Sequence, residues 1–356
     1  MDDAHFMRKA LALAERGRGH TSPNPMVGAL VVDDAGIIVG RGAHLVAGGP
    51  HAEVIALTDA GAKARGATLY CTLEPCSHTG RTGPCAPLVA AAGIRRAVIA
   101  MEDPNPIVHG GGLRHLRDRG VETIVGVEAA AAERLNAVFL TNIRQRRPHV
   151  TLKAALSVDG RLGRPGARTR LTRADADRRV QRQRAEVDAL GVGSGTLLQD
   201  DPRLTARGAY RDRPLTRVVF DRRLRTPPTA RLLSTLEAGP VIIVSSARGV
   251  AAAPERAAAL AAAGARLLPV DSSDLRVALR ALEDAGIVSL VLEDGGTLHR
   301  AALDAGVVDA VSLYITPAQL GADGVEGLGA RRLAWDLLRD RRATWLGADL
   351  LVEGLV

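Results

Sequence analysis

Three side chains between residues 51 and 85 constrain the fold of this chain more than any other feature. His51 stands in His51-Ala52-Glu53, and Cys76 and Cys85 each follow a proline. One histidine nitrogen and two thiolates can hold Zn²⁺ and leave the fourth tetrahedral position to a water molecule. The sequence therefore predicts an open zinc site whose ligands come from separate parts of the chain.

The residue types around this site fit hydrolytic chemistry. Zinc lowers the pKa of a bound water enough to supply hydroxide near neutral pH. Glu53 can take the proton from that water and pass it to a ring nitrogen and then to departing ammonia, without binding the metal itself. This combination is the signature of zinc deaminases that act on nucleobases. It predicts removal of an amino group from a pyrimidine-like or purine-like ring.

The spacing of the two cysteines departs from the common pattern. Base deaminases of the usual type have Pro-Cys-x-x-Cys, whereas eight residues separate Cys76 from Cys85. A proline before each cysteine fits a thiolate at a turn or helix start, where free backbone N–H groups meet its charge. The longer loop carries polar groups suited to a larger or more anionic substrate, namely His78, Arg81 and Thr82.

A closed structural zinc site is the main alternative. Its fourth ligand would be His78 or Cys71, but Glu53 would then have no purpose, which disfavours this interpretation. Cys71 lies in an apolar segment typical of a strand, where a cysteine behaves as a small buried hydrophobe. His44 and His78 lie near the motif and can each contact substrate or be a satisfied structural histidine. The sequence leaves both possibilities open.

Length and composition are those of a globular chain with two domains. The 356 residues exceed what one core normally organises. Aromatic residues make up only 2%, so the cores must consist of Val, Leu, Ile and Ala. The acidic start and the lack of a long apolar run predict neither a signal peptide nor a membrane span. Three cysteines, two of them assigned to zinc, fit a reducing cytoplasm without disulfides.

The basic charge favours a small phosphorylated substrate over nucleic acid. The net charge is +8, and all but three of the 47 Lys and Arg residues are Arg. The charge is dispersed, and the aromatic platform expected of single-strand binders is missing. A few arginines suit a substrate phosphate. A nucleic-acid-binding deaminase-like protein is the rival class, and steeply salt-dependent retention in a gel shift would reveal it.

The first half of the chain alternates helices and strands. Apolar residues at helical spacing predict a helix over 1–18, and a turn at 33–36 separates two strands of a hairpin. This rhythm predicts a mostly parallel sheet with helices on its faces. A polar segment over 142–148 closes the first domain. The other expected elements are helices at 51–60, 87–92 and 112–119 and strands at 27–32, 37–40, 68–73 and 94–101.

The second half repeats this α/β pattern without any cysteine. Two glycine-bearing turns, 191–196 and 293–297, follow expected strands, and such turns at a helix start suit a dinucleotide phosphate. The first is not a Rossmann fingerprint, because Thr196 stands where the third glycine belongs. By themselves both turns are weak evidence. The expected strands are 150–155, 189–192, 217–221, 241–245, 289–293 and 309–315, and the expected helices are 173–184, 255–263, 274–285 and 297–304.

Motifs along the whole chain resemble those of the bifunctional riboflavin-biosynthesis deaminase/reductases of bacteria. The long loop between the cysteines separates this family from cytidine and tRNA adenosine deaminases. In the first half the matching motifs are Pro23-Asn24-Pro25-Met26-Val27-Gly28, His51-Ala52-Glu53, Thr72 to Thr82 and Asp103-Pro104-Asn105-Pro106. In the second half they are Lys153 with Ser157-Val158-Asp159-Gly160-Arg161, Thr196 with Asp200 to Thr205, and Glu293 with Gly295 to Leu298.

The resemblance implies two folds and two activities. Residues 1–146 would form a cytidine-deaminase-like three-layer domain that hydrolyses an amino group from 2,5-diamino-6-ribosylaminopyrimidinone 5′-phosphate. Residues 147–356 would form an α/β domain similar to dihydrofolate reductase, which uses NADPH to open and reduce the ribosyl group to ribityl. The resemblance also implies a homo-oligomer.

Individual roles follow from the matching positions. The resemblance implies that His51, Cys76 and Cys85 bind zinc and that Glu53 carries protons. The positions expected to contact NADPH are Ala155, Arg170, Thr196, Asp200, Gly295, Gly296, Thr297 and Leu298. Those expected to contact substrate are Asn24, Arg168, Arg184, Leu204, Arg207 and Glu293.

Two positions depart from the family pattern. Arg170-Leu171-Thr172 stands where the family often has a tryptophan beside the nicotinamide, and Gly83 replaces a proline before Pro84. The second change is expected to be silent. The first removes an aromatic wall and adds charge at the cofactor, although an arginine can instead contact the NADPH phosphates. An enzyme in which only the zinc half works is therefore the alternative.

Overall fold

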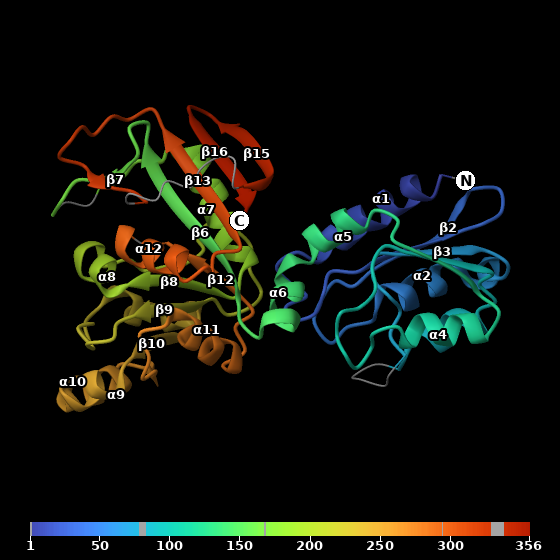
Figure 1. Ribbon diagram of the computed structural model, residues 1–356, viewed down its shortest axis with the longest axis horizontal. Coiled ribbons are helices and arrows are strands. Elements are labelled where there is room, and N and C mark those ends of the chain that lie inside the picture. The colour runs from blue at the N-terminus through green and yellow to red at the C-terminus, as the bar shows by residue number, and fades with distance from the viewer. Residues whose placement is uncertain (1, 78–82, 167–168, 294, 329–337) are drawn as a thin grey trace. The chain divides into compact units, whose positions relative to one another are not determined.

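The computed structural model describes residues 2–77, 83–166, 169–293, 295–328 and 338–356. The chain divides into two compact units, Met1–Arg146 and Arg147–Val356, each with its own sheet and core (Figure 1). A chain of this length is expected to split in this way, because a single core stops growing at about 250–300 residues. Within the described ranges, no helix is long and apolar enough to cross a membrane.

The first unit is built on a five-stranded sheet with the order β2-β1-β3-β4-β5. Its strands are β1 (Gly28–Val32), β2 (Ile38–Ala43), β3 (Thr68–Cys71), β4 (Arg96–Ile99) and β5 (Glu122–Val125). Its helices are α1 (Asp3–Ala14), α2 (Ala52–Ala60), α3 (Cys85–Ala91), α4 (Gly111–Asp118), α5 (Ala129–Leu135) and α6 (Ala137–Gln145), with short 3₁₀ turns η1 (Glu15–Gly17) and η2 (Gly61–Ala64).

The predicted hairpin of β1 and β2 is present, but the sheet is only half parallel. Strand β1 runs antiparallel to both β2 and β3, whereas β3, β4 and β5 are parallel. The expectation of a mostly parallel sheet is therefore wrong for this unit. For β1 and β2 the reason is local: only five residues, 33–37, join them, and a connection that short allows only an antiparallel pair.

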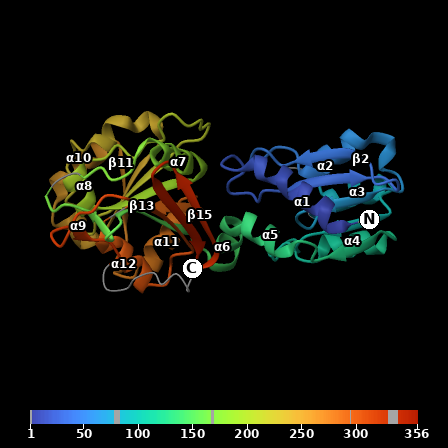
Figure 2. The same cartoon turned by 90° about the horizontal axis from the view of Figure 1, so that it is seen from above.

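Glycines let helices pack closely on both faces of this sheet. A Cβ on Gly28 would lie 2.0 Å from the Ala10 carbonyl oxygen of α1, and one on Gly42 would lie 2.0 Å from the Ala52 carbonyl oxygen of α2. Gly42 pairs with Ala29, the neighbour of Gly28, and successive residues of a strand face opposite sides. Helices α1 and α2 thus cover opposite faces, as Figure 1 shows, and Figure 2 views the unit from the α1 side.

The polar end predicted for the first unit is part of a helix. Helix α6 continues to Gln145, and Arg146 then adopts a left-handed conformation with φ of 52°. Phe139 and Leu140 are buried while Arg144 and Gln145 are exposed. The polar residues form the solvent face and last turn of an amphipathic helix, so composition alone made the segment look like a linker. Strand β5 and helix α5 were also not predicted.

The second unit contains a nine-stranded sheet with the order β11-β10-β9-β8-β12-β6-β13-β16-β15. The strands are β6 (His149–Ser157), β8 (Ala189–Gly193), β9 (Thr216–Phe220), β10 (Val241–Ser245), β11 (Ala265–Pro269), β12 (Ser289–Leu292), β13 (Ala310–Thr316), β15 (Arg339–Leu346) and β16 (Asp349–Leu355), and β7 (Arg161–Gly163) pairs separately with β14 (Val325–Glu326). The helices are α7 (Ala174–Glu186), α8 (Ser194–Asp200), α9 (Ala247–Ala251), α10 (Pro254–Ala262), α11 (Leu275–Asp284) and α12 (Gly296–Asp304), with η3 (Arg231–Ala238).

Alternation along the strands divides this unit's core between the two faces of the sheet. Leu290 and Leu292 of β12 pack in one cluster with residues of α11 and α12, whereas Val291 packs in another with residues of α8 and α10. This is the period-two pattern of a strand buried on both sides. The near-continuous apolar runs of these parallel strands are what made them predictable from the sequence.

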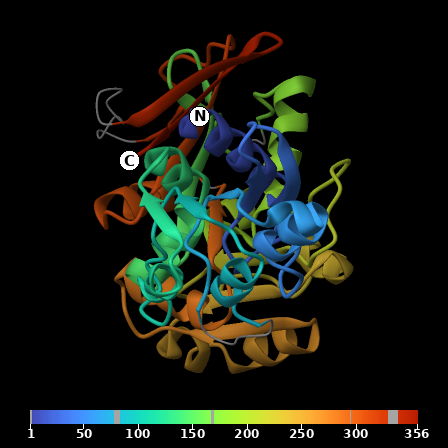
Figure 3. The same ribbon diagram turned by 90° about the vertical axis from the view of Figure 1, so that its right-hand side faces the viewer.

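All six strands and four helices predicted for the second half are present within a few residues of their expected bounds. The β15–β16 hairpin was not predicted. It extends the sheet antiparallel beside β13, and Figure 3 shows it as the red hairpin at the edge. Strand β15 is exposed along almost its whole length, so its sequence lacks the apolar alternation that marks a half-buried strand.

Candidate functional site

Three segments of the first unit bring the predicted zinc ligands together. His51 is the N-cap residue of α2, Cys85 is the first residue of α3, and Cys76 lies in the loop after β3. His51 Nδ1 lies 3.2 Å from Cys85 Sγ and 3.6 Å from Cys76 Sγ. Ligands about 2.0–2.3 Å from one tetrahedral ion lie roughly 3.5 Å apart. The donor set and its spacing therefore fit Zn²⁺.

The start of α3 supports the thiolate of Cys76. The backbone N–H of Cys85 donates to Cys76 Sγ at 3.3 Å, as expected for a thiolate at a helix start. A hydrogen bond with the Cys85 thiol and another with His51 lower the pKa of Cys76 to about 4. The same hydrogen bond with Cys76 raises the pKa of Cys85. A thiolate held in this way favours a bound metal ion.

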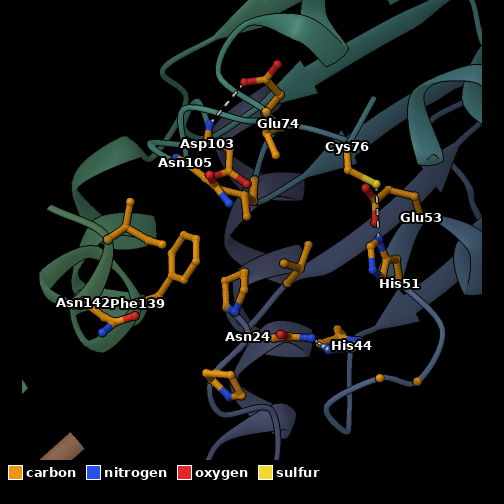
Figure 4. Close-up of a pocket in the computed structure, with 18 residues that line it drawn as sticks. Asn24, His44, His51, Glu53, Glu74, Cys76, Asp103, Asn105, Phe139 and Asn142 are labelled. Atoms are coloured by element: carbon orange, nitrogen blue, oxygen red, sulfur yellow. Dashed lines mark hydrogen bonds between the residues drawn. The ribbon is translucent and has the colours of Figure 1, made fainter. Parts of the chain in front are cut away.

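Glu53 stands in the first turn of α2, beside His51 and Cys76 (Figure 4). It is 3% exposed, and burial raises its pKa to about 7, with a smaller contribution from Cys76. A carboxyl with a pKa near the working pH can both accept and release a proton. Cys71 is fully buried on β3, and among the described residues it is not part of the ligand cluster. His78 lies outside the described residues.

A cavity of about 520 Å³ opens onto this site, within the range typical of small-molecule pockets. Its wall comes from 23–27, 44–53, 73–76, 103–108 and the α6 segment 139–143, so most of it is loop. Figure 4 shows His51, Glu53 and Cys76 grouped at one side of the pocket and Phe139 at the other. The cavity is large enough for a substrate that extends beyond a single ring.

Asn24 and His44 form one wall of the pocket as a hydrogen-bonded pair. His44 Nδ1 lies 3.0 Å from the Pro50 carbonyl oxygen, which can only accept, so Nδ1 carries the proton. His44 Nε2 then accepts from the Asn24 amide at 3.2 Å. Burial lowers the pKa of His44, which favours the neutral ring. His44 thus combines both alternatives left open by the sequence, since it is satisfied internally and also lines the pocket.

Several pocket residues carried no assigned role in the sequence analysis. Asp103 and Asn105 belong to a motif for which the sequence indicated no function. The signal that could have found them is an acidic and an amide residue that alternate with two prolines after a strand. Glu74 was noted only as part of the cysteine motif. Phe139 and Asn142 were missed because α6 was not predicted.

The second unit contains a buried cluster of three charged side chains. Arg184 Nε and Nη2 each lie 2.7 Å from one oxygen of Glu293, and Lys153 Nζ lies 3.8 Å from Glu293 Oε2. Their side chains are at most 15% exposed. Burial alone would raise the pKa of Glu293, but Arg184 and Lys153 hold it at about 2. Burial lowers the pKa of Lys153, against the attraction of Glu293.

The two glycine-bearing turns meet in this unit. Neighbouring parallel strands β8 and β12 lead into α8 and α12, and the Gly295 N–H donates to Thr196 Oγ1 at 3.1 Å. Ligands of open α/β sheets bind at the carboxyl ends of strands, and two adjacent helix starts there suit the phosphates of NADPH. A Cβ on Gly296 would lie 3.1 Å from the Gly327 carbonyl oxygen, so a side chain there would fit only if that backbone moved by a few tenths of an ångström.

Other positions predicted around the cofactor have varied surroundings. Asp200 ends α8, Thr297 is exposed in the first turn of α12, and Leu298 is buried in the core. Ala155 of β6 is paired with Tyr314 of β13. The Arg170 side chain is 76% exposed and forms an ion pair with Asp177. The predicted cofactor contacts of these residues stay predictions.

The substrate positions predicted in the second unit are held differently from one another. Arg184 donates to Glu293 and also to the Thr205 carbonyl oxygen at 3.0 Å. Most of the hydrogen-bonding capacity of its guanidinium is therefore used within the protein. Leu204 is buried with a φ of 52°. Arg207 is exposed and donates to Thr205 Oγ1 at 3.0 Å. Arg168 lies outside the described residues.

Comparison with protein families defines the class of each unit. Residues 1–101 match the cytidine and deoxycytidylate deaminase zinc-binding region, and residues 148–351 match the RibD C-terminal domain. The chain is thus a two-domain enzyme in which a zinc-dependent deaminase unit precedes a reductase unit.

Similarity to particular proteins extends over the whole chain. The riboflavin biosynthesis protein RibD of Aquifex aeolicus is 39% identical over 98% of this chain and 97% of its own length, and that of Escherichia coli is 40% identical over 91% and 90%. The structure of Acinetobacter baumannii RibD superposes with a TM-score of 0.86 at 35% identity, covering 99% of this chain and 98% of that one. The chain belongs to the RibD family of riboflavin biosynthesis proteins.

The alternative of a degenerate reductase unit finds no support. The RibD C-terminal family model covers 148–351, and the cluster of Lys153, Arg184 and Glu293 is complete. Zn²⁺ and NADPH are the cofactors that correspond to the two units, and the His51, Cys76 and Cys85 cluster fits the first of them.

Proposed function

We propose that this chain catalyses two consecutive reactions on one phosphorylated pyrimidine. The deaminase unit would hydrolyse an amino group of 2,5-diamino-6-ribosylaminopyrimidinone 5′-phosphate, and the reductase unit would then convert the ribosyl group to ribityl with NADPH. A Thermotoga maritima protein described as a diaminohydroxyphosphoribosylaminopyrimidine deaminase and 5-amino-6-(5-phosphoribosylamino)uracil reductase is 30% identical, with a TM-score of 0.82 over 99% of this chain and 97% of its own. The observation that carries the proposal is buried Glu53 beside three converging ligands at the pocket.

In the deaminase unit, His51, Cys76 and Cys85 would hold the metal and Glu53 would move protons. Zn²⁺ bound there supplies a water acidic enough to react as hydroxide near neutral pH. Glu53 accepts the proton of the attacking water and delivers it to the ring nitrogen, and then assists the departure of ammonia. The reaction replaces one C–N bond by a C–O bond. The pair of Asn24 and His44 would orient the ring through its fixed hydrogen-bonding pattern.

In the reductase unit, Lys153 would be the proton donor and Glu293 its orienting partner. Reduction of the ribosyl group breaks the bond between C1′ and the ring oxygen, adds a hydride from NADPH at C1′ and needs a proton on that oxygen, which becomes a hydroxyl. Lys153 is a buried ammonium whose pKa is lowered by burial, which favours proton release. Glu293 and Arg184 fix the ammonium in place. The turns at Thr196 and Gly295 would receive the cofactor phosphates.

A coupled assay tests both activities at once. Purified protein receives the diamino substrate and NADPH, and ammonia release and NADPH absorbance are followed together, with and without a zinc chelator. The proposal predicts ammonia first, NADPH consumption after it, and loss of both signals with chelator. Ammonia release without NADPH consumption would contradict the assignment of the reductase unit. The lack of both ammonia release and NADPH consumption would contradict the assigned substrate.

Two further expectations stay predictions. A cytoplasmic location suits the ligand cysteines, which must remain reduced, and the described structure contains no disulfide. A homo-oligomer is expected from the family, and sedimentation of the purified protein would test it.

A further inference from the structure

The Glu74 carboxylate is bound by the backbone of a different pocket segment. Its Oε1 accepts from the N–H groups of Gly112 and Leu113 at 2.9 and 3.2 Å. Its Oε2 accepts from those of Asp103 and Gly110 at 3.2 and 3.0 Å. Glu74 is 3% exposed. One side chain therefore holds both ends of the segment 103–113.

These four bonds leave the carboxylate no capacity for other chemistry. An ionised carboxylate offers about four lone-pair sites, and each oxygen of Glu74 already accepts two N–H groups. It cannot bind a metal ion without breaking them. Two of the donors belong to the first turn of α4, whose positive helix end favours a negative charge at this place. Figure 4 shows Glu74 near Asp103 and apart from His51 and Glu53.

The segment held by Glu74 carries two polar residues of the pocket. Asp103 and Asn105 line the cavity, and local bonds shape the turn between them: Asp103 Oδ1 accepts from the Asn105 N–H at 2.9 Å, and Asn105 Oδ1 accepts from the Ile107 N–H at 3.1 Å. The segment forms no strand that a sheet could hold. Its distance from the metal ligands therefore depends on the bonds of Glu74 together with backbone contacts, such as that of the Glu74 N–H with the Met101 carbonyl oxygen.

A close backbone contact also holds the segment 103–113 at its distance from the metal ligands. A Cβ on Gly112 would lie 1.8 Å from the Pro75 carbonyl oxygen, so α4 begins directly against the residue between Glu74 and Cys76. The chain 74–76 thus joins the anchor of the pocket segment to a metal ligand through one intervening residue.

We propose that Glu74 is a positioning residue for the deamination, which places Asp103 and Asn105 over the ring held beside the metal site. This inference rests on the proposed deaminase function. Glu74→Gln replaces one acceptor oxygen by an NH₂ group that faces N–H donors. The segment should then loosen while the metal ligands, Glu53 and the pocket size are kept.

The test compares the full-length wild type with Glu74→Gln in zinc content, deamination kinetics and backbone amide exchange. We expect unchanged zinc content, a KM for the diamino substrate raised roughly tenfold, a kcat within about threefold, and faster exchange over 103–113. Glu15→Gln is the matched control, because Glu15 lies in the same unit, its side chain is 54% exposed and it pairs with Arg18 outside the segment. The control should match the wild type in every measurement.

Different outcomes separate this inference from the proposed function. A wild type that releases no ammonia contradicts the proposed function itself. An active wild type with unchanged KM or unchanged exchange in Glu74→Gln overturns the positioning role, as does a variant that loses zinc or loses only kcat. Should Glu74→Gln fold too poorly for assay, Glu74→Asp takes its place. It keeps the charge but is one methylene shorter, so the same rise in KM is expected and a normal KM overturns the proposal.

Discussion

The two sites of this protein are built in opposite ways. The proposed deaminase site takes His51, Cys76 and Cys85 from one stretch of 35 residues, at helix starts and in a loop. The proposed reductase site takes Lys153, Arg184 and Glu293 from elements up to 140 residues apart along the chain. The first is a set of ligands that converges on the place of one metal ion. The second is an ionic cluster of two cations and one carboxylate.

The two sites should therefore respond differently to the substitution of one residue. Removal of one metal ligand should empty the deaminase site and leave the fold of the second unit unchanged, because the two units have separate cores. Removal of Glu293 would leave two buried cations without their counter-charge, which costs stability as well as activity.

The largest effect is expected for Cys76→Ser. A hydroxyl is a poor zinc ligand compared with a thiolate, so the variant should lose both zinc and ammonia release. NADPH oxidation with the already deaminated substrate should stay near that of the wild type. Metal analysis and the two separate assays check this, with Cys71→Ala as the control that keeps zinc. Full zinc occupancy in Cys76→Ser would remove this cysteine from the ligand set.

Glu53→Gln should abolish proton transfer and keep the metal. Loss of a general acid–base group typically lowers the rate by about 10²–10⁴-fold, and the amide preserves the shape of the side chain. We expect this loss in ammonia release with full zinc content and normal reduction of deaminated substrate. Substantial deaminase activity in this variant would contradict the role of Glu53.

Glu293→Gln should impair reduction and weaken the second unit. Arg184 and Lys153 would remain buried without their counter-charge, and breaking such a cluster costs about 3–5 kcal/mol. We expect NADPH oxidation to fall roughly 100-fold, equivalent to about 2.7 kcal/mol, with ammonia release retained. Glu255→Gln on the exposed surface of α10 is the control. Loss of both activities would show that the units do not function separately.

The contribution of Glu293 to stability should disappear in acid. Its pKa falls from an ordinary 4.5 to about 2 on folding, so the folded state binds its proton less tightly than the unfolded state does. The stabilisation, roughly 3 kcal/mol, is fully present above pH 4.5 and is lost as the pH falls toward 2. Urea unfolding of wild type and Glu293→Gln should therefore give a difference in unfolding free energy that shrinks below pH 4.5. A difference independent of pH would contradict an ionic role.

The smallest effect is expected for Arg170→Ala. Its ion pair with Asp177 is largely exposed, and such pairs contribute about 0–1 kcal/mol. We expect the unfolding free energy to change by less than about 1 kcal/mol and the KM for NADPH by less than about threefold. A tenfold increase that weakens with added salt would instead place this guanidinium on the cofactor phosphates.

The deaminase site was the more predictable of the two from sequence. The ligand set, Glu53 and the helix start at His51 were predicted, since each depends on residue type and short spacing. The pocket wall of α6 was not, because the buried Phe139 and Leu140 are followed by polar residues that resemble a linker. The positioning role proposed for Glu74 could not be predicted either, since its partners are backbone N–H groups 29 to 39 residues away in the chain.

The zinc chemistry, the division into two α/β units and most of the strands of the reductase unit could be predicted from the amino-acid sequence alone. These features are local: a ligand type, a proline, a run of apolar residues. Three contacts are seen only in the folded chain: Arg184 pairs with Glu293, Thr196 bonds to Gly295, and one carboxylate holds 103–113. Such contacts depend on strand order and on the face to which each side chain points. Strand order arises when whole elements pack together, so no short segment of sequence contains it.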